Sequence, residues 1–194
     1  MAKIHLIIGG ARSGKSRLAE QLAKASKQEV VYIATAKADD EEMAARIAHH
    51  QANRPDTWRL IESPLQLADT INQHNKDSTC LLIDCLTLWL SNCLCQHDLA
   101  YFQQEKAALL AALEASNSNI ILVSNEVGHG IVPLGELSRE FVDQAGWLHQ
   151  EIAQLAVQVD FVFAGLPLTM KSPLQTKPLV TAVKPWWGKV IENK

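Results

Sequence analysis

Residues 4–16 read Ile-His-Leu-Ile-Ile-Gly-Gly-Ala-Arg-Ser-Gly-Lys-Ser, an apolar run followed by a complete G-x-x-x-x-G-K-S motif. The apolar run has the length and composition of a buried strand, and Leu18 and Leu22 begin a helical pattern directly after the motif. Glycines let such a loop curl so that successive backbone N–H groups face phosphate oxygens, and the following helix adds its positive N-terminal end. The order of strand, loop and helix therefore predicts a nucleoside triphosphate site.

The motif gives its polar residues separate tasks. Lys15 would lie against the β and γ phosphates, and Ser16 would place its hydroxyl on Mg²⁺. Arg12 would either contact a phosphate or face water. The predicted phosphate loop consists of Gly9, Gly10, Ala11, Arg12, Ser13, Gly14, Lys15 and Ser16.

Composition limits the class of protein. The chain has 194 residues, 47% of them hydrophobic and 20% charged, with a net charge of −3 and a pI near 6.2. These values are typical of one globular domain, and the scattered Lys and Arg leave no basic field for nucleic acid or an anionic membrane. No apolar run reaches the length of a membrane span, and the N-terminal apolar stretch leads into the phosphate loop rather than a signal-peptide cleavage site. We expect a cytoplasmic protein with a small-molecule substrate.

The four cysteines lack the paired C-x-x-C spacing of a zinc site. We expect reduced, mostly buried thiols at Cys80, Cys85, Cys93 and Cys95.

Strand-like runs alternate with helical patterns along the chain. The runs cover residues 4–8, 29–34, 58–62, 80–85, 119–124 and 160–164, and the helical patterns cover 15–26, 40–51, 65–74, 86–93, 99–115 and 135–157. This alternation predicts an α/β fold, a mostly parallel sheet with helices on both faces, over residues 1–170. Residues 171–194 contain three Pro and little periodicity, and we expect an irregular C-terminal extension there.

Ligands bind at the carboxyl ends of the strands in such sheets. Asp84 ends the apolar strand Leu-Leu-Ile-Asp at 81–84, the form of the second nucleotide motif, in which the acid holds Mg²⁺ directly or through water. An Asp at the end of a strand often stabilises a turn instead, but in a chain with a phosphate loop we interpret Asp84 as a metal ligand. Residues 125–128, Asn-Glu-Val-Gly, follow another strand, and their side chains either meet substrate or cap the loop.

Residues 39–55 open with acids and close with His and Arg, a polarity that suits the helix dipole and a surface helix. The alternative interpretation is that this segment takes part in catalysis. His49 and His50 are adjacent and point about 100° apart, whereas His50 and Arg54 share a helix face. A neutral imidazole there could attack the α phosphorus of a bound triphosphate while Arg54 neutralises phosphate charge. The remaining histidines have no evident partner, and we interpret them as structural or surface residues: His5, His74, His97, His129 and His149.

Several separated motifs, in order, resemble one family. They are the phosphate loop at 9–16, Tyr-Ile-Ala-Thr-Ala at 32–36, the run from 40 to 55, Trp58, Glu62, the strand ending at Asp84, and Val-Ser-Asn-Glu-Val-Gly at 123–128. Over residues 3 to about 170 the chain resembles the bifunctional adenosylcobinamide kinase and adenosylcobinamide-phosphate guanylyltransferase family of cobalamin synthesis. The family often has Glu at the position of Asp84, and the tail after about Lys171 has no counterpart in it.

The resemblance implies two reactions. A nucleoside triphosphate, ATP or GTP, phosphorylates the aminopropanol hydroxyl of adenosylcobinamide. GTP then transfers GMP to a histidine, and the guanylyl group moves on to adenosylcobinamide phosphate. A phosphohistidine-type bond is energy-rich enough to pass GMP onward, and two easier displacements replace one hard one.

The resemblance also implies site residues and assembly. The guanylylated histidine corresponds to His50. Nucleotide contacts fall on the phosphate loop and on Ala34, Thr35, Ala36, Gln51, Ala52, Asn53, Arg54, Glu62 and Asp84, with Mg²⁺ as cofactor at Ser16 and Asp84. The implied fold is a RecA-like P-loop domain, and the implied assembly is a small homo-oligomer, a trimer.

Two other functions compete with this one. A simple small-molecule kinase would need the phosphate loop and Asp84 but no covalent histidine. A nucleotide-dependent switch is disfavoured because the pair Asn75-Lys76 is followed by Ser78 at the place where guanine-reading switches carry Asp.

Overall fold

The computed structural model describes residues 3–37 and 55–173, and within them the strands form one seven-stranded sheet. The strand order is β3-β2-β4-β5-β1-β6-β7, and every neighbouring pair is parallel except β6 and β7. The elements are β1 (Ile4–Gly9), α1 (Lys15–Ala25), β2 (Glu29–Ala34), β3 (Arg59–Glu62), α3 (Leu67–His74), β4 (Thr79–Asp84), α4 (Leu86–Gln96), α5 (Leu99–Ala115), β5 (Asn119–Asn125), α6 (Glu136–Leu155), β6 (Gln158–Phe163) and β7 (Leu166–Lys171).

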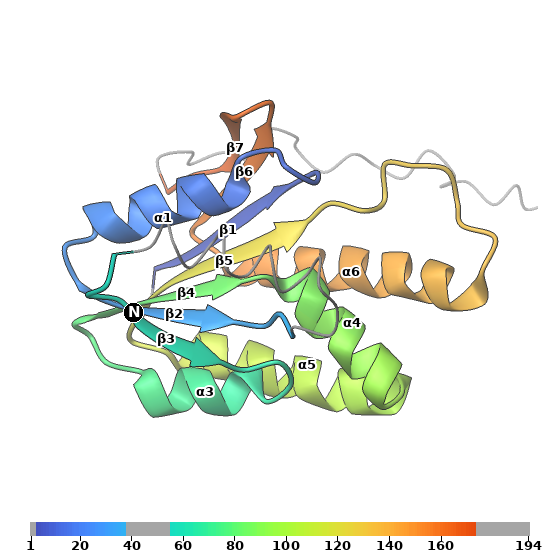
Figure 1. Cartoon of the computed structure of the whole chain (residues 1–194), viewed down its shortest axis with the longest axis horizontal. Helices are drawn as coiled ribbons and strands as arrows, with labels where there is room; N and C mark the ends of the chain where they lie inside the picture. Colours follow the sequence, from blue (N-terminus) through green and yellow to red (C-terminus); the bar gives the residue numbers. More distant parts are fainter. Residues whose placement is uncertain (1–2, 38–54, 174–194) are drawn as a thin grey trace, which may run out of the picture.

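Helices cover both faces of the sheet. Figure 1 shows α1 on one face and α3, α4, α5 and α6 on the other. The central strands are apolar on both sides, so each contributes side chains to two hydrophobic cores. In β4, Leu81 and Ile83 belong to the larger core under α3 to α6, whereas Cys80 and Leu82 belong to the smaller core under α1. Strands buried on both faces read as continuous apolar runs, which explains the sequence pattern and confirms the predicted α/β arrangement.

The predicted elements agree with the structure apart from one missed edge strand and differences of a few residues at element ends. The strand β7 was not predicted, because it is an exposed edge strand that carries Pro167 and shows no alternation of buried and exposed residues. It ends at Lys171, the first residue of the expected extension. The helix α4 also runs to Gln96, three residues past its predicted end. The predicted helix over 40–51 and residues 174–194 lie outside the described residues.

The described residues contain no helix that is long and apolar enough to cross a membrane. The thiols fit the sequence-based expectation: all four are free, with Cys80, Cys85 and Cys93 buried and Cys95 exposed.

Candidate active site

The phosphate loop joins the end of β1 to the start of α1, at the carboxyl edge of the sheet. Gly14 has a φ of 101°, a left-handed conformation that favours glycine, and Lys15 opens the helix. Gly9 lies against β6 so closely that a Cβ on it would be 2.4 Å from the Val162 carbonyl oxygen. The loop therefore needs glycine at Gly9 for packing and at Gly14 for conformation.

Two polar side chains of the loop are held in its interior. The Lys15 ammonium donates to the Gly10 carbonyl at 2.7 Å and is buried. Burial lowers the pKa of Lys15, and the nearby carboxylate of Asp84 opposes that shift. The Ser13 hydroxyl is buried as well, and its oxygen has no hydrogen-bond partner in the described part of the chain. A buried, unpartnered hydroxyl in a phosphate cradle is a donor that suits a phosphate oxygen.

Asp84 ends β4 two strands away from β1. Tyr32 on the neighbouring strand β2 donates its phenolic proton to the Asp84 carboxylate at 3.1 Å. Sheet register places Glu62, Ala34 and Asp84 in one row across β3, β2 and β4. The structure therefore brings these three predicted residues to one edge of the sheet.

Thr35 is completely buried just beyond β2, and its hydroxyl fastens the ends of two strands. It donates to the Cys85 carbonyl at 2.7 Å and accepts from the Cys85 amide at 2.8 Å. The hydroxyl proton of Thr35 is thus already used within the protein. Burial and the charge of Asp84 raise the pKa of Cys85 to about 11, so this thiol stays protonated beside the loop.

The remaining predicted contacts are placed as follows. Ala36 is described and half-buried next to Thr35. The proposed nucleophile and its neighbours lie outside the described residues: His50, Gln51, Ala52, Asn53 and Arg54.

The donor chemistry at the loop fits Mg²⁺. The ion prefers hard oxygen ligands, and it is commonly held by one or two protein groups together with substrate phosphates and water. The Ser16 hydroxyl at the start of α1 and the Asp84 carboxylate supply such oxygens. Asp84 ends β4 at the same carboxyl edge of the sheet at which β1 ends in the phosphate loop.

The end of β5 holds a polar network that the sequence reasoning missed. His149 on α6 is buried, and its Nε2 lies 2.6 Å from the Ser124 hydroxyl oxygen. Its Nδ1 lies 4.0 Å from a carboxylate oxygen of Glu126. The sequence indicated no partner for His149 or for His5, which lies 2.7 Å from the Asp160 carboxylate, and both side chains are held by hydrogen bonds within the protein.

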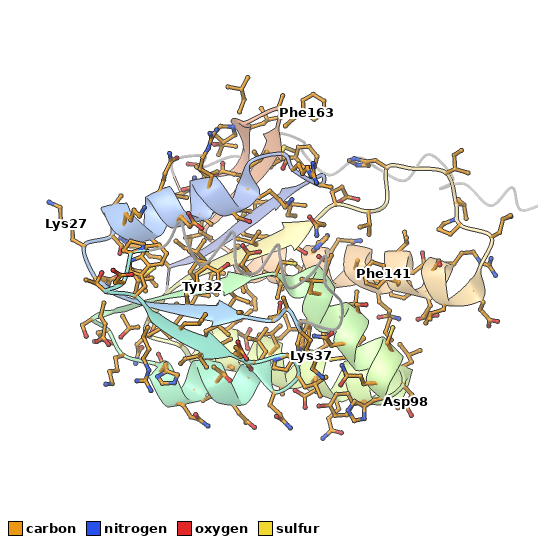
Figure 2. All side chains as sticks on the ribbon, in the orientation of Figure 1. Lys27, Tyr32, Lys37, Asp98, Phe141 and Phe163 are labelled. Carbon is orange, nitrogen blue, oxygen red and sulfur yellow. The ribbon has the colours of Figure 1, made fainter. Side chains whose placement is uncertain are left out.

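A hairpin supports the phosphate loop from the other side. The turn between β6 and β7 places the Gly165 amide 2.8 Å from the Ser13 carbonyl, and Gly14 approaches Gly165 closely. Figure 2 shows Phe163 at the tip of this hairpin, where its ring is 74% exposed.

Comparison with known proteins gives a family and a fold. A family model described as cobinamide kinase / cobinamide phosphate guanyltransferase matches residues 5–170. The chain is 56% identical over 174 residues to the bifunctional adenosylcobalamin biosynthesis protein CobP of Pseudomonas aeruginosa, covering 90% of this chain and 98% of that protein. It is 39% identical over 179 residues to the bifunctional adenosylcobalamin biosynthesis protein CobU of Escherichia coli K12, covering 86% and 98%.

Two solved structures share the architecture. A protein of Pyrococcus horikoshii OT3 aligns with a TM-score of 0.52 and 10% identity over 92% of this chain and 94% of that one. An ATPase of a bacterial type III secretion system aligns with a TM-score of 0.52 and 12% identity over 87% and 58%. At these identities the likeness concerns the fold alone, which is the RecA-like P-loop arrangement expected from the sequence.

Proposed function

The chain belongs to the cobinamide kinase / cobinamide phosphate guanyltransferase family, and we propose how its residues divide that family's two reactions. The protein is a bifunctional transferase of adenosylcobalamin biosynthesis, a cobinamide kinase and a cobinamide phosphate guanylyltransferase. The observation that carries this conclusion is the family match over residues 5–170, which includes the whole phosphate loop and Asp84.

In our proposal the loop of residues 9–16 holds the phosphates of ATP or GTP. The buried Ser13 hydroxyl and the loop amides donate to phosphate oxygens, and Lys15 exchanges the Gly10 carbonyl for the β and γ phosphates. Ser16 and Asp84 would hold Mg²⁺, which when bound neutralises phosphate charge. Ala34, Thr35, Ala36 and Glu62 would line the nucleotide site at the ends of β2 and β3. Thr35 would shape the site from behind, because its hydroxyl, amide and carbonyl already bond to Cys85, Asp84 and Asn92.

The transferase reaction would use His50. The imidazole attacks the α phosphorus of GTP, an N–P bond forms, and the P–O bond to pyrophosphate breaks. A phosphate oxygen of adenosylcobinamide phosphate then attacks the same phosphorus, and the N–P bond breaks. Gln51, Ala52, Asn53 and Arg54 would bind the nucleotide beside it. The support for this assignment is the sequence of residues 40–55 and the family match that contains it.

We also propose that the protein works as a homo-oligomer, a trimer, in the cytoplasm, where its nucleotide substrates are made. An apolar segment leads from β5 into α6 and projects from the body of the molecule (Figure 1). The large side chains of this segment and of the first turn of α6 are exposed: Ile131 97%, Val132 72%, Leu134 98% and Leu137 57%. Exposed large apolar side chains that lie close together in the sequence are typical of a protein interface. Light scattering should show a trimer for the wild type and smaller species for Leu134→Ser.

The decisive test of the transferase reaction compares wild type, His50→Ala and His49→Ala after incubation with α-labelled GTP and Mg²⁺. Acid-labile label that is lost only in His50→Ala would support the guanylyl-histidine at this position. Loss only in His49→Ala would move the nucleophile by one residue. Phosphorylation of cobinamide by a wild type that never acquires label would favour the simple kinase instead.

A further inference from the structure

The network at the end of β5 consists of three side chains from two elements. Ser124 is fully buried on β5, His149 is 7% exposed on α6, and Glu126 follows β5 with its carboxylate partly exposed. The contacts run in one line, from the Ser124 hydroxyl through both nitrogens of His149 to the Glu126 carboxylate. The line therefore leads from the core of the protein to its surface.

The chemistry of the three groups favours one direction for the hydrogen bond between Ser124 and His149. His149 Nδ1 lies 4.0 Å from Oε2 of Glu126, and a carboxylate at this distance favours the tautomer that carries its proton on Nδ1. Burial lowers the pKa of His149, which keeps the ring neutral and leaves Nε2 without a proton. Nε2 therefore accepts from the Ser124 hydroxyl, which locks the ring in the orientation that presents Nδ1–H to the carboxylate.

Glu126 lies between the two parts of the nucleotide site, the phosphate loop and Asp84. The strand β5 lies between β1, which ends in the phosphate loop, and β4, which ends in Asp84. The Glu126 amide donates to the Gly9 carbonyl at 3.0 Å, and the preceding residue Asn125 pairs with Gly9 in the sheet. Glu126 thus lies at the carboxyl edge of the sheet, where the terminal phosphate and its acceptor would meet.

One carboxylate oxygen also caps the loop. Oε1 accepts from the Gly128 amide at 2.6 Å, whereas Oε2 is the oxygen near His149. Each carboxylate oxygen has two lone pairs, so Oε2 can face the imidazole and still take a proton from a substrate. The cap thus holds the carboxylate in place without consuming its basic oxygen.

We propose that Glu126 is the general base of the kinase reaction and that His149, held by Ser124, is its positioning residue. The substrate hydroxyl gives its proton to Oε2 of Glu126, and its oxygen bonds to the γ phosphorus. The bond from that phosphorus to the bridging oxygen breaks, the nucleoside diphosphate leaves, and Glu126 returns its proton to water. A positioned base contributes about 10²- to 10⁴-fold to such a step.

The second reaction of the same enzyme needs no such base. A neutral imidazole attacks phosphorus with its own lone pair, and a cobinamide phosphate acceptor is already ionised. The proposal rests on the family's kinase activity, and the guanylylation reaction offers an internal control for folding and nucleotide binding.

The test measures both reactions in Glu126→Gln, which keeps the size of the side chain and an oxygen for the Gly128 cap but cannot take the proton. We expect phosphorylation of adenosylcobinamide to fall by at least about 100-fold. Labelling of the protein by α-labelled GTP should stay within about twofold of wild type, which also shows that the variant folds. The control Glu114→Gln, an exposed residue near the end of α5, should change neither reaction.

His149→Gln tests the positioning role. We expect a lower kcat for phosphorylation with an unchanged nucleotide KM and unchanged labelling, because only the orientation of Glu126 is affected. Phosphorylation by Glu126→Gln at the wild-type rate would overturn the proposal, and so would equal loss of both reactions, which would make the residue structural. A wild type that is labelled by GTP but phosphorylates no cobinamide would instead refute the kinase function itself.

Discussion

The backbone amide of Gly165 donates to the carbonyl of Ser13 at 2.8 Å, and this bond joins the turn of the β6–β7 hairpin to the middle of the phosphate loop. The hairpin lies on the opposite side of β1 from β5 and β4. The loop is therefore supported from both sides, by backbone contacts with the hairpin and by β5, after which the Glu126 amide donates to the Gly9 carbonyl.

Gly165→Ala should destabilise the protein. Gly165 has a φ of 81°, and a Cβ in this conformation costs about 1 kcal/mol, although the nearest atom would be 3.5 Å away on Arg17. The expected change is a fall in Tm of about 2–4 °C for a chain of this size. Gly130→Ala, where a Cβ would meet nothing within 4 Å, is the matched control. Equal melting temperatures of the two variants would contradict the prediction.

Gly9→Ala and Gly10→Ala should differ sharply, although the residues are adjacent. A Cβ on Gly9 would overlap the backbone of Val162, whereas one on Gly10 would meet nothing within 4 Å. We expect the free energy of unfolding to fall by about 3 kcal/mol for Gly9→Ala, because backbone cannot move as easily as a side chain. Gly10→Ala should keep its stability. Urea unfolding curves measure both, and a stable Gly9→Ala would show that β6 can shift away from the loop.

Asp84→Asn should lower Mg²⁺-dependent turnover of both reactions by at least about tenfold, because the amide removes a charged oxygen ligand. Tyr32→Phe keeps the Asp84 carboxylate and removes the hydroxyl that donates to it, and it should cost less, since a single hydrogen bond is worth about 1 kcal/mol. Titration of the rate with Mg²⁺ separates the two effects. Unchanged turnover in Asp84→Asn would remove this residue from the site.

Stability should decrease as the pH falls below about 6.5, partly because of His149. Burial lowers its folded-state pKa below the ordinary value of 6.5, so the unfolded chain binds a proton at a pH where the folded protein does not. The unfolded state is then favoured as the pH drops from 6.5 to the folded pKa. His149→Gln should flatten this part of the curve of unfolding free energy against pH. The pKa of His74 is also lowered, so His74 contributes to the pH dependence of the unfolding free energy with the same sign in the wild type and in His149→Gln. Identical slopes would show that His149 does not titrate in this range.

A thiol reagent should modify Cys95 first. Cys95 is exposed, whereas Cys80, Cys85 and Cys93 are buried, and burial raises the pKa of their thiols to about 11, 11 and 12. We expect one thiol per chain to react rapidly at pH 8 in the native protein and all four to react in denaturant. Loss of the rapid reaction in Cys95→Ser confirms the identity of this thiol, and two or more rapidly reacting thiols in the wild type would contradict the burial.

Much of the fold could be predicted because its strands are apolar on both faces and its helices have clear apolar spacing. The phosphate loop and Asp84 were found because each follows such a strand. The row of Glu62, Ala34 and Asp84 was not deducible from composition or spacing, since it depends on sheet register between separate strands. The contacts implied for residues 51–54 stay predictions.

The network of Ser124 and His149 had a signal that the sequence reasoning did not use. His149 lies on the apolar stripe of α6, four residues after Ala145 and three before Ile152, where a polar ring is buried and needs a partner. The contact of Gly165 with Ser13 had no such signal, because it joins two backbone groups far apart in the sequence and involves no side chain.

The sheet order also affects how the protein is made. The strand β1 is synthesised first, but both of its neighbours, β5 and β6, come from the second half of the chain. Until residues 119–125 and 158–163 have left the ribosome, the segment that ends in Gly9 has no native strand beside it. Contacts so far apart in sequence slow folding and leave apolar segments exposed in the meantime. The phosphate loop is therefore made long before the strands that flank it, so a nascent chain cannot complete the nucleotide site until residues 158–163 have been made.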